Sequence, residues 1–268
     1  MRSVDELPGA QVATVFTDID DTLTTDGKLG AQAYAALESL QRAGLRVIPV
    51  TGRPAGWCDQ IARLWPVEGV IGENGALYMW HDRASSMLRT RHLLDEPARA
   101  RNAARLARVR ERILHEVPGC AVASDQFCRQ YDLAIDFRED VPPLPDAQID
   151  RIAALMEDAG MTAKVSSIHV NGWFGDYDKL STARLMMAER YGVDLADDAR
   201  RDECVFAGDS PNDAPMFDYF PLSVGVANVL AYSARLPHLP RYITRHPFGA
   251  GFAELAHHLL RHRDGHAA

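Results

Sequence analysis

Two groups of acidic residues stand where the sequence predicts that buried strands end. Asp18 and Asp20 follow the apolar run VATVFT, and Asp209 and Asp213 follow the apolar run CVFAG much later in the chain. Carboxylates gathered in one pocket repel one another, so such a pocket needs a cation or shared protons. If the two groups meet in space, they form an all-oxygen site that suits Mg²⁺. This pattern points to an enzyme that handles phosphate.

Each motif alone has a simpler interpretation. An Asp-x-Asp pair such as Asp18 and Asp20 is commonly a pair of solvated turn residues or helix caps. In GDSPND, Asp209 could cap the helix that Pro211 begins, and Asp213 could complement the helix dipole. The shared position of the motifs therefore matters more than any one of them.

Two further segments could bind phosphate. Thr51, Gly52 and Arg53 lie between a predicted strand end and Pro54, where a hydroxyl group and a helix N-terminus face one crevice. Lys179 opens a predicted helix. The simpler interpretation is a capping threonine, a surface arginine and a solvent-facing lysine that pairs with a neighbouring aspartate.

The residues named above lie in a predicted pattern of strands that alternate with helices. Such alternation is typical of a parallel sheet covered on both faces, in which ligands bind beyond the carboxyl ends of the strands. The predicted strands are 12–17, 45–50, 68–72, 204–208, 222–226 and 241–244, and the predicted helices are 30–43, 54–64, 179–191, 211–219 and 250–262.

The middle of the chain has a different pattern, which predicts an inserted α+β domain over residues 82–175 within a discontinuous core of residues 1–81 and 176–268. Its predicted strands are 86–93, 120–127, 131–138, 162–166 and 168–173, and its predicted helices are 97–117 and 146–159. Alternation in the last strand places Ile168 and Val170 on one face, and Ser167, His169, Asn171 and Trp173 on the other. The polar face is a candidate for contact with substrate hydroxyl groups; the alternative is an ordinary solvated face.

Composition limits the function further. The chain has 268 residues, 47% of them hydrophobic and 25% charged, which is typical of a soluble globular protein. A formal net charge of −8 argues against nucleic acid or an anionic membrane as the main partner. Neither a signal peptide nor a membrane span is expected, and the four cysteines lack metal-ligand spacing, so a cytoplasmic location is the expectation. The many arginines of 97–117 are expected to form a solvated helix face.

Taken together, the motifs resemble those of the haloacid dehalogenase-like phosphohydrolase superfamily. Its ordered pattern stands here as DIDDT (18–22), Thr51, Lys179 and GDSPND (208–213). GENGA (72–76) and the long insertion are similar to the Cof-type, subclass IIB branch, which includes sucrose-phosphate and mannosyl-3-phosphoglycerate phosphatases. Asp21 departs from the glycine common in that branch, so it must tolerate the turn geometry or supply extra charge.

The resemblance implies a Rossmann-like, doubly wound core with the insert as a cap, and a Mg²⁺-dependent phosphatase that acts on a small phosphorylated metabolite, with a sugar phosphate as the expected class. It implies that Asp18 is the nucleophile, which forms an aspartyl-phosphate, and that Asp20 is the general acid and base. Implied metal ligands are Asp18, the backbone carbonyl of Asp20, Asp209 and, through water, Asp213. The expected substrate contacts are Thr51, Gly52, Arg53, His169, Asn171, Lys179 and Asn212, with Thr51 and Lys179 on the phosphoryl oxygens.

Two alternatives remain open. A phosphotransferase or phosphosugar mutase would use the same aspartyl-phosphate with a sugar hydroxyl as acceptor. A phospho-accepting signalling domain also combines acids, a threonine and a lysine on a doubly wound sheet, but such domains are about half this length and their lysine follows all the acids. The oligomeric state is left undetermined.

Overall fold

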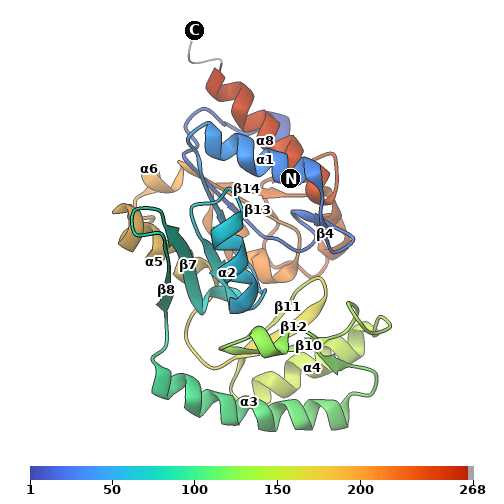
Figure 1. Ribbon diagram of the computed structural model, residues 1–268. Coiled ribbons are helices and arrows are strands. Elements are labelled where there is room, and N and C mark those ends of the chain that lie inside the picture. The colour runs from blue at the N-terminus through green and yellow to red at the C-terminus, as the bar shows by residue number, and fades with distance from the viewer. Residues whose placement is uncertain (265–268) are drawn as a thin grey trace.

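A six-stranded parallel sheet forms the centre of the computed structural model, which describes residues 1–264 (Figure 1). The strand order is β1-β15-β14-β13-β2-β5, and every neighbouring pair is parallel. The strands are β1 (Arg2–Ser3), β2 (Thr14–Thr17), β5 (Arg46–Pro49), β13 (Cys204–Gly208), β14 (Leu222–Gly225) and β15 (Tyr242–Ile243). All residues of β2 and β13 are buried, as a parallel sheet with both faces covered requires.

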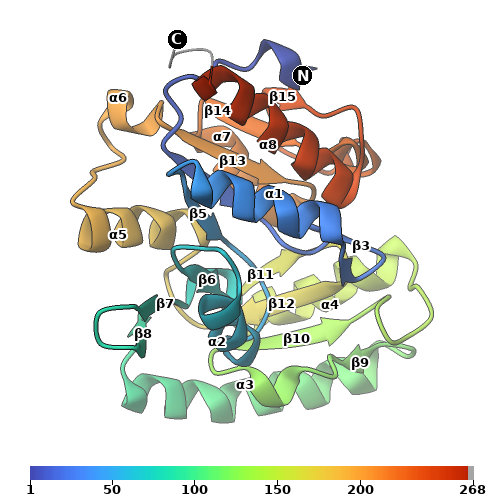
Figure 2. The same ribbon diagram turned by 45° about the horizontal axis from the view of Figure 1, so that its top comes forward.

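Helices cover both faces of this sheet. Val15 of β2 belongs to an apolar cluster with α1 (Ala31–Arg42) and α8 (Phe248–Asp264), which lie side by side in Figure 2. The next residue, Phe16, belongs to a second cluster with α5 (Lys179–Tyr191) and α7 (Ala214–Tyr219). Neighbouring strand residues thus face opposite layers, and the expected doubly wound core is confirmed.

A three-stranded antiparallel sheet continues from the core. Its strands are β6 (Val70–Gly72), β7 (Leu77–Asp82) and β8 (Met87–His92), and α2 (Ala55–Leu64) packs against it. The expected boundary at residue 82 falls at the end of β7, and β8 pairs along the whole of β7 rather than with strands later in the insert. The division into 1–81, 82–175 and 176–268 remains a prediction.

The rest of the insert is a second layered unit, residues 96–173, which we call the cap. Its antiparallel sheet has the order β11-β12-β10-β9. The strands are β9 (Ala121–Val122), β10 (Asp132–Asp136), β11 (Thr162–Val165) and β12 (His169–Trp173), and the helices are α3 (Glu96–Glu116) and α4 (Asp146–Asp158). Val109 and Ile113 of α3 pack with Val170 of β12 in one apolar cluster. The arginines of α3 therefore lie outside its buried stripe, as expected.

Two local predictions for the cap are wrong. The strand expected over 120–127 is limited to β9, and the 3₁₀ helix η3 (Gln126–Cys128) follows it. The Gln126 side chain there donates to the carbonyl of Asp132 and accepts from the N–H of Ala134, so a side chain takes the place of a strand partner. Residues 166–168 form a turn closed by Ser166, so Ile168 leaves the alternation and lines the cleft instead of packing with Val170.

Short elements complete the chain. They are η1 (Val4–Glu6), β3 (Thr24–Thr25), β4 (Lys28–Leu29), η2 (Glu73–Gly75), α6 (Asp198–Arg201), η4 (Pro211–Asp213) and η5 (Ala227–Tyr232). No helix within residues 1–264 has both the length and the apolar character that crossing a bilayer demands.

Candidate active site

The order of the strands brings the sequence motifs together. β2 lies between β13 and β5, and all three run in the same direction, so the residues that follow them share one edge of the sheet. Asp18 follows β2, Asp209 follows β13, and Thr51 comes shortly after β5. The N–H of Asp18 donates to the carbonyl of Ala207 at 2.9 Å, which ties the first acidic group to the strand that carries the second.

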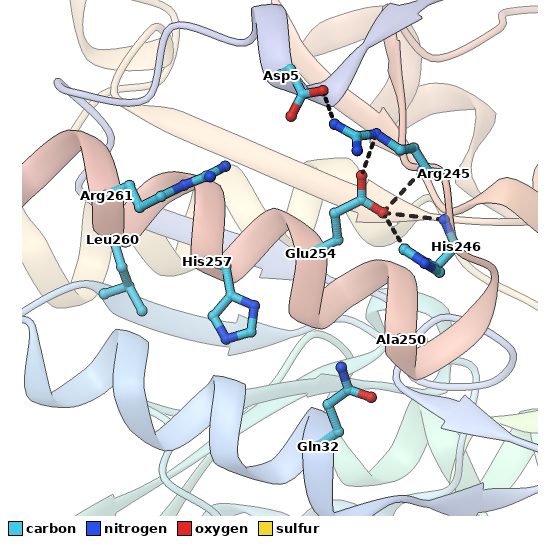
Figure 3. A pocket seen from close by; sticks show the side chains of 9 residues that line it. All are labelled: Asp5, Gln32, Arg245, His246, Ala250, Glu254, His257, Leu260 and Arg261. Carbon is cyan, nitrogen blue, oxygen red and sulfur yellow. Dashed lines mark hydrogen bonds and ion pairs between the residues drawn. The ribbon is translucent and has the colours of Figure 1, made fainter.

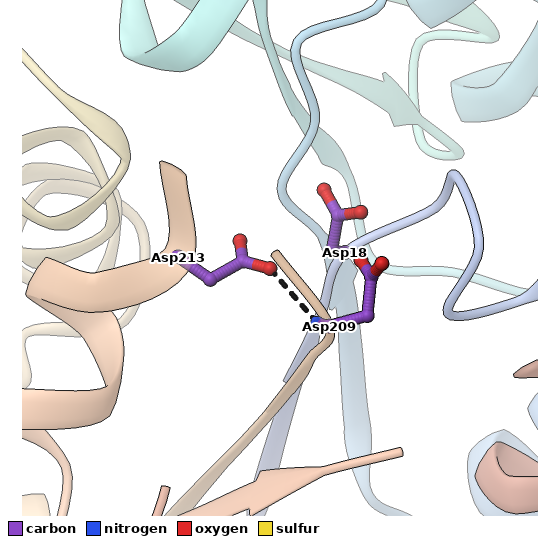
Figure 4. A group of neighbouring side chains, drawn as sticks. All are labelled: Asp18, Asp209 and Asp213. Carbon is purple, nitrogen blue, oxygen red and sulfur yellow. Dashed lines mark hydrogen bonds between the residues drawn. The ribbon is translucent and has the colours of Figure 1, made fainter. Parts of the chain in front are cut away.

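Three aspartates converge at this edge (Figure 4). Asp18, Asp209 and Asp213 each offer a carboxylate oxygen, and these oxygens lie within 4.8 Å of one another. All three residues are buried. Burial, and then the neighbouring acids, raise the pKa of Asp209 well above its ordinary value, and burial likewise raises the pKa of Asp18 to about 8. The expectation that residues 18 and 209 share one crevice is confirmed.

Lys179 lies inside this cluster rather than in solvent. Its Nζ atom is 2.7 Å from Oδ1 of Asp18 and 2.7 Å from Oδ1 of Asp213. The lysine is 2% exposed; burial opposes its charge, but the two aspartates raise its pKa above the ordinary value. The capping box of Asp178 and Ser181 starts α5 at this residue and directs it into the core. The solvent-facing interpretation of Lys179 is therefore wrong.

The cluster fits a divalent cation. Three buried carboxylates face a single ammonium group, so the site has excess negative charge that a hard cation with oxygen ligands would neutralise. Asp213 already uses its two oxygens: Oδ1 accepts from Lys179, and Oδ2 accepts from the N–H groups of Asp209 and Ser210. Within residues 1–264, the Asp209 carboxylate accepts only two longer hydrogen bonds from neutral groups, at 3.2 and 3.3 Å, and the Asp18 carboxylate accepts one, from Lys179. Asp18 and Asp209 are thus the better candidates for direct ligands, and Asp213 for one that acts through water.

Asp209 has two partners that hold its side chain. Thr22 Oγ1 donates to Oδ1 at 3.2 Å, and Asn228 Nδ2 donates to Oδ2 at 3.3 Å. The same Asn228 amide donates to the carbonyl of Asp21. Asn228 was not predicted as a site residue, because Asn228 belongs to the separate η5 segment and lies in no motif.

Asp21 shows why a glycine would suit its position. Its φ angle is 57°, in the left-handed region that most side chains avoid. Aspartate is among the residues that tolerate this conformation, and the Asp21 N–H is satisfied by Thr24 Oγ1 at 3.0 Å. Burial raises the pKa of Asp21. Asp21 therefore both adopts the turn geometry and adds a carboxyl group beside the site.

Asp20 faces a different partner from Asp18. Its two oxygens accept from Nε of Arg53 at 3.0 Å each, and Nη2 of Arg53 donates to Oδ1 at 2.8 Å. The guanidinium also donates to two cap carboxylates, to Asp125 at 3.3 Å and to Glu139 at 2.6 Å. Arg53 is 4% exposed. Its donors are thus directed at three carboxylates, and the expected role of Arg53 in holding phosphate stays a prediction.

Three residues of the expected phosphate cradle line a small cavity. Gly52, Arg53 and Asn212 lie beside Asp18 and Asp20 around a space of about 10 Å³. Thr51 is fully buried at the same loop, and its Oγ1 accepts from the N–H of Arg53 at 3.0 Å. Cap residues 166–169 and Asn171 line the other side of this space.

The cap strand β12 supplies the opposite wall. His169 and Asn171 are 3% and 2% exposed and line the small cavity, as expected. Nε2 of His169 lies 3.0 Å from Oε2 of Glu139, and Asn171 Nδ2 donates to Asp132 at 2.9 Å. Trp173 instead stacks on Tyr177 within the apolar core, which removes it from the substrate face. Glu139, Asp125 and Asp132 were missed, because nothing in their local sequence marks them.

A wider cleft opens next to the small cavity. It holds about 390 Å³ and is lined by Asp20, Asp21, Arg53, Arg138, Glu139, Ile168 and Tyr232, among others. A larger cavity of about 760 Å³ lies along α8, with Asp5, Arg245 and Gln32 of α1 at its edges, away from the acidic cluster (Figure 3). Its Arg245 pairs with Asp5 and Glu254, and its His246 also contacts Glu254. The cleft beside Asp20 is therefore the larger open space next to the small cavity.

Comparisons with known proteins agree with this fold. Residues 15–101 match the family model of haloacid dehalogenase-like hydrolases, and a search of curated protein sequences finds no significant match. Similar solved structures include a Thermoplasma acidophilum protein (18% identity, TM-score 0.68, 93% of this chain and 98% of that one). A Plasmodium vivax protein described as a HAD/Cof-like hydrolase has 17% identity and a TM-score of 0.67, over 97% of this chain and 99% of that one.

A third similar structure is the sucrose-phosphatase of Synechocystis, determined with sucrose and phosphate bound, with 16% identity and a TM-score of 0.62 over 97% of this chain and 98% of that one. At these identities the solved structures show the fold, and they show it over nearly the whole chain. The predicted fold is thus confirmed, and the family model, which matches residues 15–101, supports the resemblance to haloacid dehalogenase-like hydrolases.

Proposed function

We propose that this protein is a Mg²⁺-dependent phosphatase that hydrolyses a small phosphorylated metabolite, with a sugar phosphate as the favoured substrate class. The observation that carries the proposal is the buried contact between Asp18 and Lys179 beside Asp209 at the carboxyl edge of the sheet. The substrate class is supported by the sucrose-phosphatase among the similar structures, by the cleft of about 390 Å³ beside Asp20 and by the polar side chains of the cap that line the small cavity.

In the proposed reaction, an oxygen of Asp18 attacks phosphorus, and the bond between phosphorus and the leaving-group oxygen breaks. Asp20 gives a proton to that oxygen, so that a neutral alcohol leaves. Water then attacks the phosphorus of the aspartyl-phosphate, Asp20 takes a proton from it, and phosphate and the Asp18 carboxylate are released. A bound Mg²⁺ would neutralise phosphoryl charge as a Lewis acid.

Other residues set the geometry of these steps. Lys179, held by Asp213, is placed to stabilise negative charge on the transferring phosphoryl oxygens, together with the Thr51 loop. Arg53 holds both oxygens of Asp20 and so fixes the direction of the acid and base. Asp125 and Glu139 of the cap accept hydrogen bonds from the same Arg53 guanidinium. In our proposal, Arg53 therefore orients Asp20 instead of binding phosphate.

The test is phosphate release from a panel of sugar phosphates, nucleotides, phosphoglycerates and acetyl phosphate with Mg²⁺. We expect wild-type turnover without an added acceptor sugar, which separates a phosphatase from a phosphotransferase or mutase. Asp18→Asn should lower kcat at least about 10³-fold while the melting temperature is kept or rises, because it removes the nucleophile and one buried charge. Unimpaired turnover in Asp18→Asn refutes the assignment of the nucleophile.

A further inference from the structure

Glu73 is a fully buried acid that the proposed reaction does not use. It begins the η2 turn between β6 and β7, within the segment GENGA, and is 0% exposed. Its φ angle is 45°, a left-handed conformation that costs free energy for a residue with a side chain. A buried carboxylate on a strained backbone persists only where its surroundings compensate for it, so its partners indicate its role.

Those partners are backbone N–H groups from two parts of the protein. Oε2 of Glu73 accepts from Tyr131 at 2.7 Å and from Asp132 at 3.2 Å, and Oε1 accepts from Gln130 at 2.8 Å. Oε1 also accepts from Ala55, at the start of α2, at 3.0 Å. One core side chain therefore binds three consecutive amides of the cap, at the point where β10 begins.

The backbone around Glu73 also holds the catalytic loops of the core. The N–H of Glu73 donates to the carbonyl of Arg53 at 3.0 Å, and the N–H of Asn74 donates to the carbonyl of Thr51 at 3.0 Å. At Gly75 a Cβ atom would lie 2.1 Å from the carbonyl oxygen of Asp178, so only glycine lets this turn approach the start of the Lys179 helix so closely. The turn thus contacts two of the expected phosphate-binding elements.

On the cap side, the clamped segment connects to the substrate wall. Asp132 accepts from Asn171 Nδ2 at 2.9 Å and from Arg129 Nη1 at 3.0 Å. Arg129 Nη1 also donates to the carbonyl of Gly52 at 2.8 Å. A continuous set of hydrogen bonds therefore runs from Glu73 through the 129–132 segment to Asn171, and back to the Thr51 loop.

We propose that Glu73 is a positioning residue, which clamps the cap segment 130–132 to the core and so sets where Asn171 stands over the substrate's leaving group. This inference rests on the proposed phosphatase function. It predicts that Glu73 affects leaving groups that touch the cap, and leaves phosphoryl chemistry in the core nearly unchanged.

Glu73→Gln tests this with two substrates at pH 8. The variant keeps the volume but places an NH₂ group against N–H donors, so at least one of the cap contacts is lost. For the sugar phosphate that the wild type hydrolyses fastest, kcat/KM should fall on the order of 10- to 100-fold, mainly through KM. For acetyl phosphate, whose leaving group has no hydroxyl to offer the cap, the change should stay within about 3-fold. Equal losses on both substrates, or no loss on either, overturn the inference.

Two comparisons sharpen the result. In the double variant Glu73→Gln/Asn171→Ala, the loss of kcat/KM should be close to that of the larger single variant, because Glu73 acts through Asn171; additive losses contradict this. Glu68→Gln is the matched control: it makes the same substitution just before β6, where the carboxylate contacts only the Gln41 side chain among the described residues. It should behave as the wild type on both substrates.

A measurement on the unaltered protein covers the case in which Glu73→Gln fails to fold. Native-state hydrogen exchange should show the amides of residues 130–132 protected to the level of the central β2 and β13 strands. Exchange at the rate of exposed loops overturns the clamp. Failure of the proposed function looks different: the wild type then releases no phosphate from any substrate, while the protection of 130–132 still reports on Glu73.

Discussion

Arg53 links the catalytic core to the cap, and its replacement tests how the two share the reaction. Arg53→Met keeps most of the side-chain length but leaves the carboxylates of Asp20, Asp125 and Glu139 without their common cation. Removal of one partner from a buried ion pair costs about 3–5 kcal/mol. The Asp20 and Glu139 side chains are 17% and 27% exposed, so we expect the lower end, about 3 kcal/mol. This corresponds to a fall in melting temperature of roughly 6–12 °C.

The effect on activity should depend on the leaving group. Without Arg53, Asp20 loses its fixed direction, and general acid–base catalysis is worth about 10²–10⁴ in rate. We expect kcat for a sugar phosphate to fall about 100-fold. Acetyl phosphate releases acetate, which needs no proton, so only the later attack of water depends on Asp20, and its kcat should fall less, on the order of 10-fold. Arg53→Lys keeps the charge but lacks the planar fork, and should restore stability more than activity.

Thermal unfolding tests the predicted loss of stability, and steady-state phosphate release with both substrates tests the predicted losses of kcat. Arg53→Met with the melting temperature and kcat of the wild type refutes the reasoning. Equal losses of kcat/KM on both substrates would instead support the phosphate-binding role that the sequence suggested for Arg53. Glu139→Gln separates the contact of Arg53 with the cap from its contact with Asp20. It removes the charge of the closest cap carboxylate and leaves Asp20 paired with Arg53.

Three further results are expected. EDTA should stop phosphate release and lower the melting temperature, with both restored by Mg²⁺, because buried carboxylates would be left crowded; a chelator without effect on either speaks against the metal site. Burial, and then Asp132, raise the pKa of Glu73 from 4.5 to about 7, so the native state binds a proton that the unfolded chain lacks in this window. The free energy of unfolding should then fall as pH rises from 4.5 to 7, by up to about 1.4 kcal/mol per unit, and Glu73→Gln should flatten this slope in urea titrations; an unchanged slope contradicts the shift. Asn228→Ala should raise the Mg²⁺ concentration for half-maximal activity about 10- to 100-fold, because Asp209 loses a donor that orients it; an unchanged Mg²⁺ dependence excludes this role.

Residues close to one another in sequence, or fixed at strand ends, could be identified without the structure. The apolar runs before Asp18 and Asp209 indicated buried parallel strands, and parallel strands place their carboxyl ends at one edge. The meeting of Asp18 and Asp209 follows from that regularity alone. The left-handed backbone conformation at Asp21 could also be expected from the sequence, because a position that glycine commonly occupies often has such a conformation, and this preference is local.

The partners of these residues were decided by the tertiary structure. Arg53 was predicted to be part of a phosphate cradle, and only the folded cap brings Asp125 and Glu139 to its guanidinium. Glu73 carries no local sign of its function, because its ligands are backbone amides, which every residue has. Hydrogen bonds and ion pairs act through space over a few ångströms, so the sequence could set the strand ends, while only the packing of cap on core determined which polar groups meet there.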